Sequence, residues 1–395
     1  MAHHPIRPGL ANPRDFLEFD SLLDDEERLM RDTVRQFVAD RVLPNVADWF
    51  EEGTFPREMC REMGSLGLLG MHLDGYGCAG TSNVAYGLAC MELEFGDSGS
   101  RSLVSVQSSL VMYPIGAYGS EEQKQQWLPG MAAGDLMGCF GLSETDAGSD
   151  PGAMRTSARR DGTDWVLNGS KMWITSGGLA DVALVWARTD DGVRGFLVPT
   201  DTPGFSVHEI PRKMSLRASS TAELVLDDVR LPDDAALPGV VGLKGPLSCL
   251  NEARFGILFG AVGAARACYE AALDYAGERV MFGKPIASFQ LIQRQLVDMM
   301  VGVNRGSLVA LQIGRLKDRG PVDPAHISFG KYDNVRMALE VARTARSVLG
   351  ANGITLEYPV IRHMNNLESV YTYEGTNEVH TLALGQTITG ISAFD

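Results

Sequence analysis

The sequence predicts an α+β protein with a helical first third, a β-rich middle and a helical last third. Three observations indicate this fold class: apolar residues at helical spacing after residue 24, short strand-like runs between residues 138 and 238, and long stretches of helix formers after residue 246. The 395 residues are enough for two or three domains, each with its own core. We place these domains at residues 1–136, 137–240 and 241–395.

The first region is expected to be helical from about residue 24 to residue 126. Four consecutive acidic residues, 24–27, place negative charge where a helix begins, and the helix dipole favours it there. Apolar residues then recur at helical spacing, at Leu29, Met30, Val34, Phe37 and Val38.

The middle region is predicted to be entirely β. Strand-like runs occur at residues 165–167, 172–174, 182–186, 195–198 and 223–226. Asn168-Gly169 lies between the first two runs and is a preferred two-residue loop, so we expect a hairpin there.

The last region returns to helix after Pro246. Residues 291–318 and 338–350 are rich in helix formers, and Gly350 and Gly353 fit a helix end. The order of helices, β domain and helical bundle is unusual and therefore informative about the class of protein.

Charge and hydropathy exclude several classes of partner. The formal net charge of −15 argues against nucleic acid and anionic membrane surfaces, because phosphate groups bind basic surfaces. No apolar run approaches the length that a membrane span needs, and no secretory signal opens the chain. We therefore expect a cytoplasmic protein.

The six cysteines, at positions 60, 78, 90, 139, 249 and 268, are scattered without a Cys-x-x-Cys pair. Most lie in apolar surroundings, which is typical of reduced thiols in a core. The pattern predicts neither a disulfide framework nor a metal site.

Residues 75–80 match the glycine fingerprint of dinucleotide-binding folds, and Glu92 and Glu94 lie at roughly the distance of its ribose-binding acid. The fingerprint has this meaning only inside a β-α-β unit. Helices are predicted upstream, and no second strand follows residues 84–95. A tight turn is therefore the better interpretation of these glycines.

Arg101 is the only formally charged residue between Ser98 and Ser120. A buried guanidinium is costly unless it is paired, so Arg101, if buried, needs an anion. Glu94 would share its helix face if the helix ran unbroken, which favours a structural ion pair. The functional alternative is that Arg101 binds a substrate carboxylate bidentately, with Glu94 and Ser102 orienting it.

Glu374 lies in the segment Tyr373-Glu374-Gly375-Thr376, on a turn with aromatic neighbours. Partial desolvation there would raise the pKa of the carboxyl group and make Glu374 a usable base. The alternative is an ordinary helix-end turn with a left-handed glycine.

Five spaced segments resemble the acyl-CoA dehydrogenase family: residues 140–150, 171–175, 279–285, 349–353 and 373–376. Within the family the chain is most similar to the glutaryl-CoA dehydrogenases, through residues 75–80, 98–109 and 388–394. The resemblance implies an N-terminal helical domain, a middle β-barrel and a C-terminal four-helix bundle. It also implies a homotetramer with one FAD per subunit and an electron-transferring flavoprotein as the acceptor.

The resemblance implies two sets of FAD contacts. The flavin ring would be flanked by Phe140, Gly141, Leu142, Ser143, Trp173 and Thr175, and further cofactor contacts would come from Ser149, Ile174, Thr376 and Glu378. The phosphates and adenosine would be bound, partly from a neighbouring subunit, by Arg279, Phe282, Gln290, Ser347, Gly350 and Ala351. Ser143 stands where the family usually has threonine, which keeps the hydroxyl. Ser347 and Ala351 replace the usual glutamine or aspartate and glycine in the turn that contacts the adenosine end.

The resemblance also implies a reaction. Glu374 would remove the α-proton of an acyl-CoA while the β-hydrogen leaves as hydride to the flavin. The Glu374 N–H and a ribityl hydroxyl would hold the thioester oxygen. Ala253 stands where a few relatives carry the base instead. The substrate would contact Glu94, Arg101, Ser102, Ser149, Leu247, Asn251, Arg254 and Gly375.

The expected reaction is oxidation of glutaryl-CoA with decarboxylation to crotonyl-CoA and CO2, because Arg101 would pair with the far carboxylate of a short diacid. One alternative is a dehydrogenase or oxidase for another short or carboxylated acyl-CoA. Another, from a different class, is a catalytically silent CoA-binding scaffold, against which the retained Glu374 argues. For Arg254 alone, the residues also allow an intrahelical pair with neighbouring acids.

Overall fold

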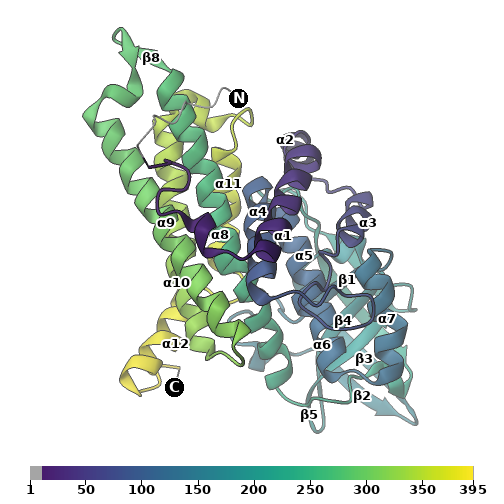
Figure 1. Cartoon of the computed structure of the whole chain (residues 1–395). Helices are drawn as coiled ribbons and strands as arrows, with labels where there is room; N and C mark the ends of the chain where they lie inside the picture. Colours follow the sequence, from purple (N-terminus) through teal and green to yellow (C-terminus); the bar gives the residue numbers. More distant parts are fainter. Residues whose placement is uncertain (1–10, 395) are drawn as a thin grey trace.

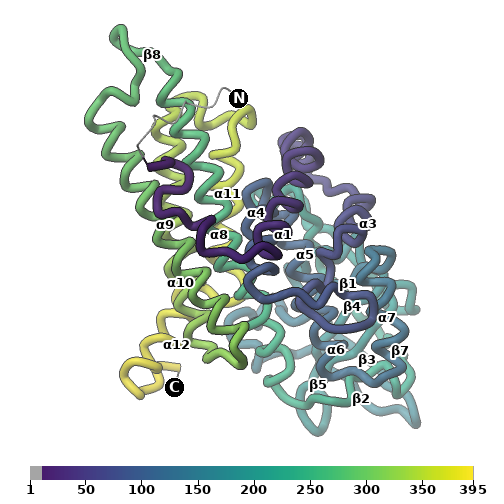
Figure 2. The backbone as a smooth tube through the Cα atoms, viewed as in Figure 1, coloured from purple at the N-terminus to yellow at the C-terminus, as the bar shows by residue number. Residues whose placement is uncertain are grey.

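The structure is a computed structural model that describes residues 11–394; residues 1–10 and 395, at the ends of the first and last predicted domains, lie outside the described residues. The long helices α8, α9 and α10 form one side of the molecule, while the N-terminal helices and the sheet form the other (Figures 1 and 2). The predicted boundaries near residues 136 and 240 fall in connecting segments.

From residue 11 on, the first region contains seven α-helices: α1 (Asp25–Phe37), α2 (Val46–Glu52), α3 (Glu58–Ser65), α4 (Asn83–Gly96), α5 (Ser98–Ser105), α6 (Tyr113–Tyr118) and α7 (Glu121–Ala133). The predicted start of α1 is confirmed. The Asp24 carboxylate accepts from the Glu27 N–H at 2.9 Å, and the Glu27 carboxylate accepts from the Asp24 N–H at 3.0 Å. These two bonds form a capping box, which satisfies donors that a helix start leaves free.

The glycines of residues 75–80 lie in a turn between α3 and α4, as predicted. Gly75, Gly77 and Gly80 all have positive φ, at 76°, 83° and 65°. No strand precedes or follows this segment within the first region that the structure describes. The dinucleotide-binding interpretation is therefore excluded by the fold.

Glu94 and Arg101 do not lie on one unbroken helix, although their expected pairing assumed that they would. Asp97 is extended, with φ −165° and ψ 143°, and its carboxylate caps α5 through the Gly99 N–H at 2.7 Å. Two side chains of α11 (Val360–Thr372) hold Asp97: Arg362 at 2.6 Å and Asn366 at 2.8 Å. The break is thus stabilised by a buried polar contact between distant helices.

The middle region is a seven-stranded sheet in the order β1 (Gly138–Gly141), β4 (Val182–Thr189), β2 (Ser157–Asp161), β3 (Asp164–Thr175), β7 (Thr221–Leu231) and β6 (Phe205–Glu209). The remaining strand, β5 (Gly192–Pro199), pairs with β4. The sheet has its own apolar cluster, in which Trp165 meets Phe196 edge-on with the ring centroids 5.2 Å apart. The predicted α+β class, with a β domain between helical regions, is confirmed.

The predicted hairpin at Asn168-Gly169 is wrong. The strand β3 continues through these residues, and the hairpin turn lies earlier, at Gly162 between β2 and β3. Gly169 has φ 142° and marks a register shift against β7. A Cβ at Gly169 would come within 2.6 Å of the Thr156 hydroxyl. Glycine is therefore needed here because the strand bulges and Thr156 packs closely against its backbone.

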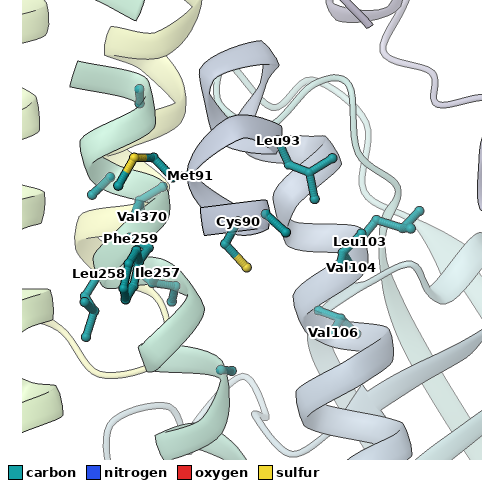
Figure 3. Packing of buried hydrophobic residues seen from close by; sticks show 14 of the residues in the cluster. Cys90, Met91, Leu93, Leu103, Val104, Val106, Ile257, Leu258, Phe259 and Val370 are labelled. Carbon is teal, nitrogen blue, oxygen red and sulfur yellow. The ribbon is translucent and has the colours of Figure 1, made fainter. Parts of the chain in front are cut away.

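The last region contains α8 (Lys244–Glu278), α9 (Gln290–Asp318), α10 (Pro324–Val348), α11 and α12 (Asn377–Thr389). A short hairpin of β8 (Val280–Met281) and β9 (Lys284–Pro285) joins α8 to α9. The helix α8 packs against both α10 and α4, so it joins the two helical regions. Figure 3 shows Cys90 and Met91 of α4 in the same cluster as Ile257 and Phe259 of α8.

Two helices pass the length and composition test for a membrane span, contrary to our expectation. Both α8 and α9 have a window of mean hydropathy 1.2. In the fold, 78% of the α8 window and 50% of the α9 window are buried inside the protein. A core helix that is covered on several sides is apolar nearly all round and passes the same test, so this is weak evidence for a membrane.

The cysteines behave as predicted. All six are free, and all except the half-buried Cys78 are buried. Burial raises the pKa of these thiols, for example to about 12 at Cys90. They are therefore protonated at neutral pH, as expected of core thiols.

Candidate active site

Glu374 lies in the short connection between α11 and α12, in a backbone conformation that non-glycine residues rarely adopt. Its φ is 51° and that of Gly375 is 94°. Three consecutive carbonyls of this loop accept hydrogen bonds from two cations. Lys331 Nζ donates to the Tyr373 carbonyl and to the Gly375 carbonyl, the latter at 2.5 Å, and Arg254 Nε donates to the Glu374 carbonyl at 2.6 Å.

Side chains pack closely around the glycine of this loop. A Cβ at Gly375 would come within 2.9 Å of His380 Nε2 and 3.1 Å of Arg254 Nη2. Thr376 then caps α12, because its hydroxyl accepts from the Val379 N–H at 3.3 Å. The loop is therefore fixed on both sides of Glu374.

The carboxyl group of Glu374 is prepared to accept a proton. Its Oε2 atom is buried and has no hydrogen-bond partner among residues 11–394. Burial raises the pKa of Glu374, while the positive charges of Arg101, Lys331 and Arg254 oppose that rise. The Glu374 N–H also has no acceptor within this described part of the chain. The loop thus offers a candidate base beside a free N–H donor.

Arg101 is completely buried, and the structure brings it to the Glu374 loop. Its Nε donates to the Glu94 carboxylate at 2.5 Å, and its Nη2 donates to the Tyr373 hydroxyl. Its Nη1 is buried and has no partner among the described residues. The structural pair with Glu94 therefore exists, and one side of the guanidinium is still available to an anion.

One detail of the expected arginine site needs correction. Among residues 11–394, Nη1 of Arg101 is unpaired, and Nη2 donates one of its two N–H groups to Tyr373. Ser102 is buried but forms no hydrogen bond with Glu94 or Arg101 in the described structure; the Ser98 hydroxyl donates to Glu94 instead, at 2.8 Å. Ser98 faces Glu94 because it follows directly after the break at Asp97.

The backbone of α8 lies directly against this ion pair, which the sequence did not indicate. A Cβ at Gly260 would come within 2.0 Å of Glu94 Oε2 and 3.2 Å of Arg101 Nε. Only glycine leaves space for the pair at this position. The signal in the sequence was a glycine inside a helix, which usually has a packing reason.

The predicted flavin-side residues of β1 and β3 lie close together. Residues 140 and 141 end β1, residues 142 and 143 follow it, and residues 173–175 end β3; the Met172 N–H donates to the Ser143 carbonyl at 2.9 Å and joins the two segments. Phe140, Leu142 and Ile174 are buried. Trp173 instead has φ 65° and is 62% exposed, so it presents an aromatic face.

The loop after β1, which carries Ser149, is fixed by a buried ion pair that sequence reasoning missed. The Glu144 carboxylate accepts from Lys171 Nζ at 2.7 Å and from the N–H groups of Arg155 and Thr156. Burial opposes ionisation, but these hydrogen bonds lower the pKa of Glu144 to about 2. Ser149 itself is exposed.

The predicted substrate contacts on α8 lie one turn apart. Leu247 is exposed, and Asn251 and Arg254 are partly buried; the Asn251 side-chain oxygen accepts from Arg254 Nη1 at 3.2 Å. The intrahelical acid pair that we considered for Arg254 is absent from the described structure, since Arg254 binds the Glu374 carbonyl. The neighbouring Glu252 pairs instead with Lys317, at 3.0 Å.

The predicted adenosine-side residues do not join this site within one chain. All are exposed and lie at or near the β8–β9 hairpin or the end of α10: Arg279, Phe282, Gln290, Ser347, Gly350 and Ala351. In Figure 1 this hairpin is at the far end of the bundle from α12, which Thr376 caps and which carries the exposed Glu378. Phe282 is 90% exposed, with φ 51°.

Family models match three successive parts of the chain: the acyl-CoA dehydrogenase N-terminal domain at residues 24–135, the middle domain at 139–229 and the C-terminal domain at 241–389. With the fold described above, these matches define an FAD-dependent dehydrogenase. The chain belongs to the acyl-CoA dehydrogenase family.

Individual relatives cover nearly the whole chain. Human mitochondrial short-chain specific acyl-CoA dehydrogenase is 36% identical over 396 residues, 97% of this chain and 96% of that protein. A crystal structure of glutaryl-CoA dehydrogenase from Mycobacterium smegmatis is 63% identical with a TM-score of 0.96, covering 97% and 99% of the two chains. A second such structure, in complex with FADH2, is 61% identical with a TM-score of 0.96, covering 98% and 100%.

The cofactor of this chain is therefore FAD, and the residues present fit it. Trp173 offers an exposed aromatic face to a flat ring. The hydroxyls of Ser143 and Thr175 have no protein partner among residues 11–394, so both are free to bind ring heteroatoms. When bound, FAD supplies the acceptor for a hydride.

Proposed function

We propose that the protein oxidises glutaryl-CoA between its α and β carbons and decarboxylates the product to crotonyl-CoA and CO2. The observation that carries this proposal is the buried Arg101, whose Nη1 is unpaired in the site of Glu374. An unpaired N–H of a buried cation is costly, and the far carboxylate of a short diacid would satisfy it. The similarity to glutaryl-CoA dehydrogenases supports the same substrate.

In the oxidation step, Glu374 takes the α-proton and the β-hydrogen leaves as hydride. The electron pair of the broken α C–H bond moves toward the thioester oxygen, where negative charge develops. The Glu374 N–H, which has no acceptor among residues 11–394, would bind that oxygen and stabilise the charge as it forms.

In the decarboxylation step, the bond between the γ-carbon and the carboxylate breaks and CO2 leaves. The electron pair of that bond enters the conjugated system of the unsaturated thioester. The proton held by Glu374 then returns to the γ-carbon, which gives crotonyl-CoA. Arg101 orients the ionised carboxylate before this step and stays paired with Glu94 throughout.

We further propose that the exposed adenosine-side residues of one subunit complete the FAD site of its neighbour in a homotetramer. Their exposure supports this assignment, as does the position of the β8–β9 hairpin at the far end of the bundle from α12 (Figure 1). We also propose a cytoplasmic enzyme without nucleic-acid or membrane partners, which passes its electrons to an electron-transferring flavoprotein. Sedimentation analysis of the FAD-loaded protein tests the assembly, and a monomer would refute it.

The wild-type enzyme is expected to prefer glutaryl-CoA over butyryl-CoA in kcat/KM, because only the diacid pairs with Arg101. Steady-state assays with both substrates measure this preference, and product analysis distinguishes crotonyl-CoA from glutaconyl-CoA. A preference for butyryl-CoA would favour the alternative, a short-chain acyl-CoA dehydrogenase, to which the 36% identity with the human enzyme also points. Peroxide formation in air would instead identify an oxidase.

The pH dependence of kcat/KM should report the raised pKa of Glu374. The base must be ionised, so activity is lost as the pH falls through that pKa. We therefore expect the acid limb to lie above the ordinary carboxyl value of about 4.3. The profile is measured with butyryl-CoA, because this substrate has no carboxyl group that titrates. An acid limb at the ordinary carboxyl pKa would contradict the buried environment of Glu374.

A further inference from the structure

Lys331 of α10 is a buried amine that no motif singled out. Burial lowers its pKa to about 7, so it carries its full charge on the acid side of neutrality. It is 2% exposed, and no carboxylate lies within ion-pair distance of it among residues 11–394. Its Nζ instead donates to the carbonyls of Tyr373 and Gly375, the residues on either side of Glu374. Burying an ammonium group without a directly paired carboxylate is costly, so the position of Lys331 calls for a functional reason.

The loop that Lys331 contacts would not hold its shape unaided. Glu374 has φ 51°, in the left-handed region where side chains other than glycine are disfavoured. Such a conformation persists only where surrounding contacts determine it, and such contacts cluster at active sites. Here the contacts are the hydrogen bonds of Lys331 to residues 373 and 375 and that of Arg254 to residue 374.

We propose that Lys331 is a positioning residue for the base: it holds the carbonyls on both sides of Glu374, fixes the left-handed loop, and favours the ionised carboxylate by its charge. This inference rests on the role of Glu374 in the proposed function. It does not depend on which acyl-CoA is the substrate.

The charge of Lys331 acts on Glu374 together with Arg101 of α5 and Arg254 of α8. Tyr373 interacts with Glu374 and with Glu94 of α4, and His380 of α12 lies near Lys331 and Arg254. Burial lowers the pKa of His380 to about 3, so that ring is neutral. Arg101 is already bound to Glu94 and Tyr373. Removing Lys331 deletes one of three cations that oppose the rise in the pKa of Glu374, so that pKa should rise further.

Exchange of the α-protons of butyryl-CoA into D2O tests this role apart from hydride transfer. The FAD-loaded enzyme is first reduced without oxygen, so that the acyl-CoA cannot be oxidised, and exchange is followed by mass spectrometry. We expect Lys331→Met to slow exchange by about tenfold or more and to move its acid limb to higher pH. Lys331→Gln keeps a hydrogen-bond donor without the charge, so it should also move the acid limb of exchange to higher pH. Lys331→Arg should partly restore both the exchange rate and the position of the acid limb.

The matched control is Asn334→Ala, three residues along the same helix. The buried Asn334 donates to the Leu258 and Gly306 carbonyls at 2.8 and 3.2 Å, away from the Glu374 loop. We expect this variant to lower the melting temperature and leave exchange and its pH profile unchanged. Wild-type exchange and pH profile in Lys331→Met, or an equal loss of exchange in Asn334→Ala, would overturn the proposal.

The same experiment separates this inference from the proposed function. If the wild type exchanges the protons of butyryl-CoA but does not turn over glutaryl-CoA, the substrate assignment fails and the Lys331 comparison still holds. If Glu374→Gln exchanges at the wild-type rate, the base assignment fails and the role of Lys331 fails with it.

Discussion

Replacing Glu374 with glutamine is expected to reduce turnover roughly 10²–10⁴-fold, the usual contribution of a positioned general base. The amide has nearly the shape of the carboxyl group but cannot accept the α-proton. Because Oε2 has no protein partner among the described residues, the substitution breaks no hydrogen bond of the fold. FAD content, read from the visible absorbance of the purified protein, should be unchanged. Steady-state assays with glutaryl-CoA and butyryl-CoA measure the loss, which should be similar for both.

A suitable control is Glu368→Gln on α11, which changes an exposed carboxylate paired with Arg343. A surface pair of this kind contributes little, so activity and stability should stay near those of the wild type. Near-normal turnover in Glu374→Gln would refute the base assignment, because Ala253 leaves no carboxylate at the other position that the resemblance suggests.

Replacing Arg101 with alanine is expected to decrease glutaryl-CoA turnover far more than butyryl-CoA turnover. The diacid loses its only predicted cation and would bury an unpaired carboxylate, whereas butyryl-CoA has no carboxylate to lose. Leaving a buried charge without its partner typically costs about 3–5 kcal/mol, equivalent to a factor of hundreds or more in kcat/KM. The ratio of the two kcat/KM values is the measurement, and equal losses would argue against a carboxylate site.

The single Arg101 variant also leaves Glu94 buried without its cation, which can destabilise the fold. The double variant Glu94→Gln with Arg101→Met removes both charges and keeps the volume of the pair. It should bind FAD and melt near the wild-type temperature, while the preference for glutaryl-CoA remains lost. If the double variant recovered that preference, substrate recognition would have to lie elsewhere.

Much of this architecture could be predicted from local sequence. The order of helical, β and helical regions follows from the change of hydrophobic period, and the α1 capping box is a local signal. Arg101 was conspicuous as a lone charge in a neutral segment, and Glu374 as an acid among aromatic residues. These features are local, so they can be recognised without knowing which distant segments meet.

The remaining features depend on contacts between distant segments. Gly169 makes a bulge because Thr156 lies against it, so its turn-like sequence was misleading. Gly260 leaves space for an ion pair that comes from two other helices. Lys331 is more than 40 residues from the loop it binds and resembles any helical lysine in the sequence. No local pattern could identify these roles.

The break at Asp97 fixes where Arg101 lies relative to the Glu374 loop, the two ends of the acyl site in the proposed function. Arg362 and Asn366 anchor the start of α5, which carries Arg101, and the helix that bears them runs directly into the Glu374 loop. The helix α11 therefore sets the spacing between the Arg101 guanidinium and the Glu374 carboxylate. A shift of one residue along such a helix is about 1.5 Å, close to one carbon–carbon bond. In the proposed function, the acyl chain length that fits between the two groups would thus be set by the backbone positions of these helices.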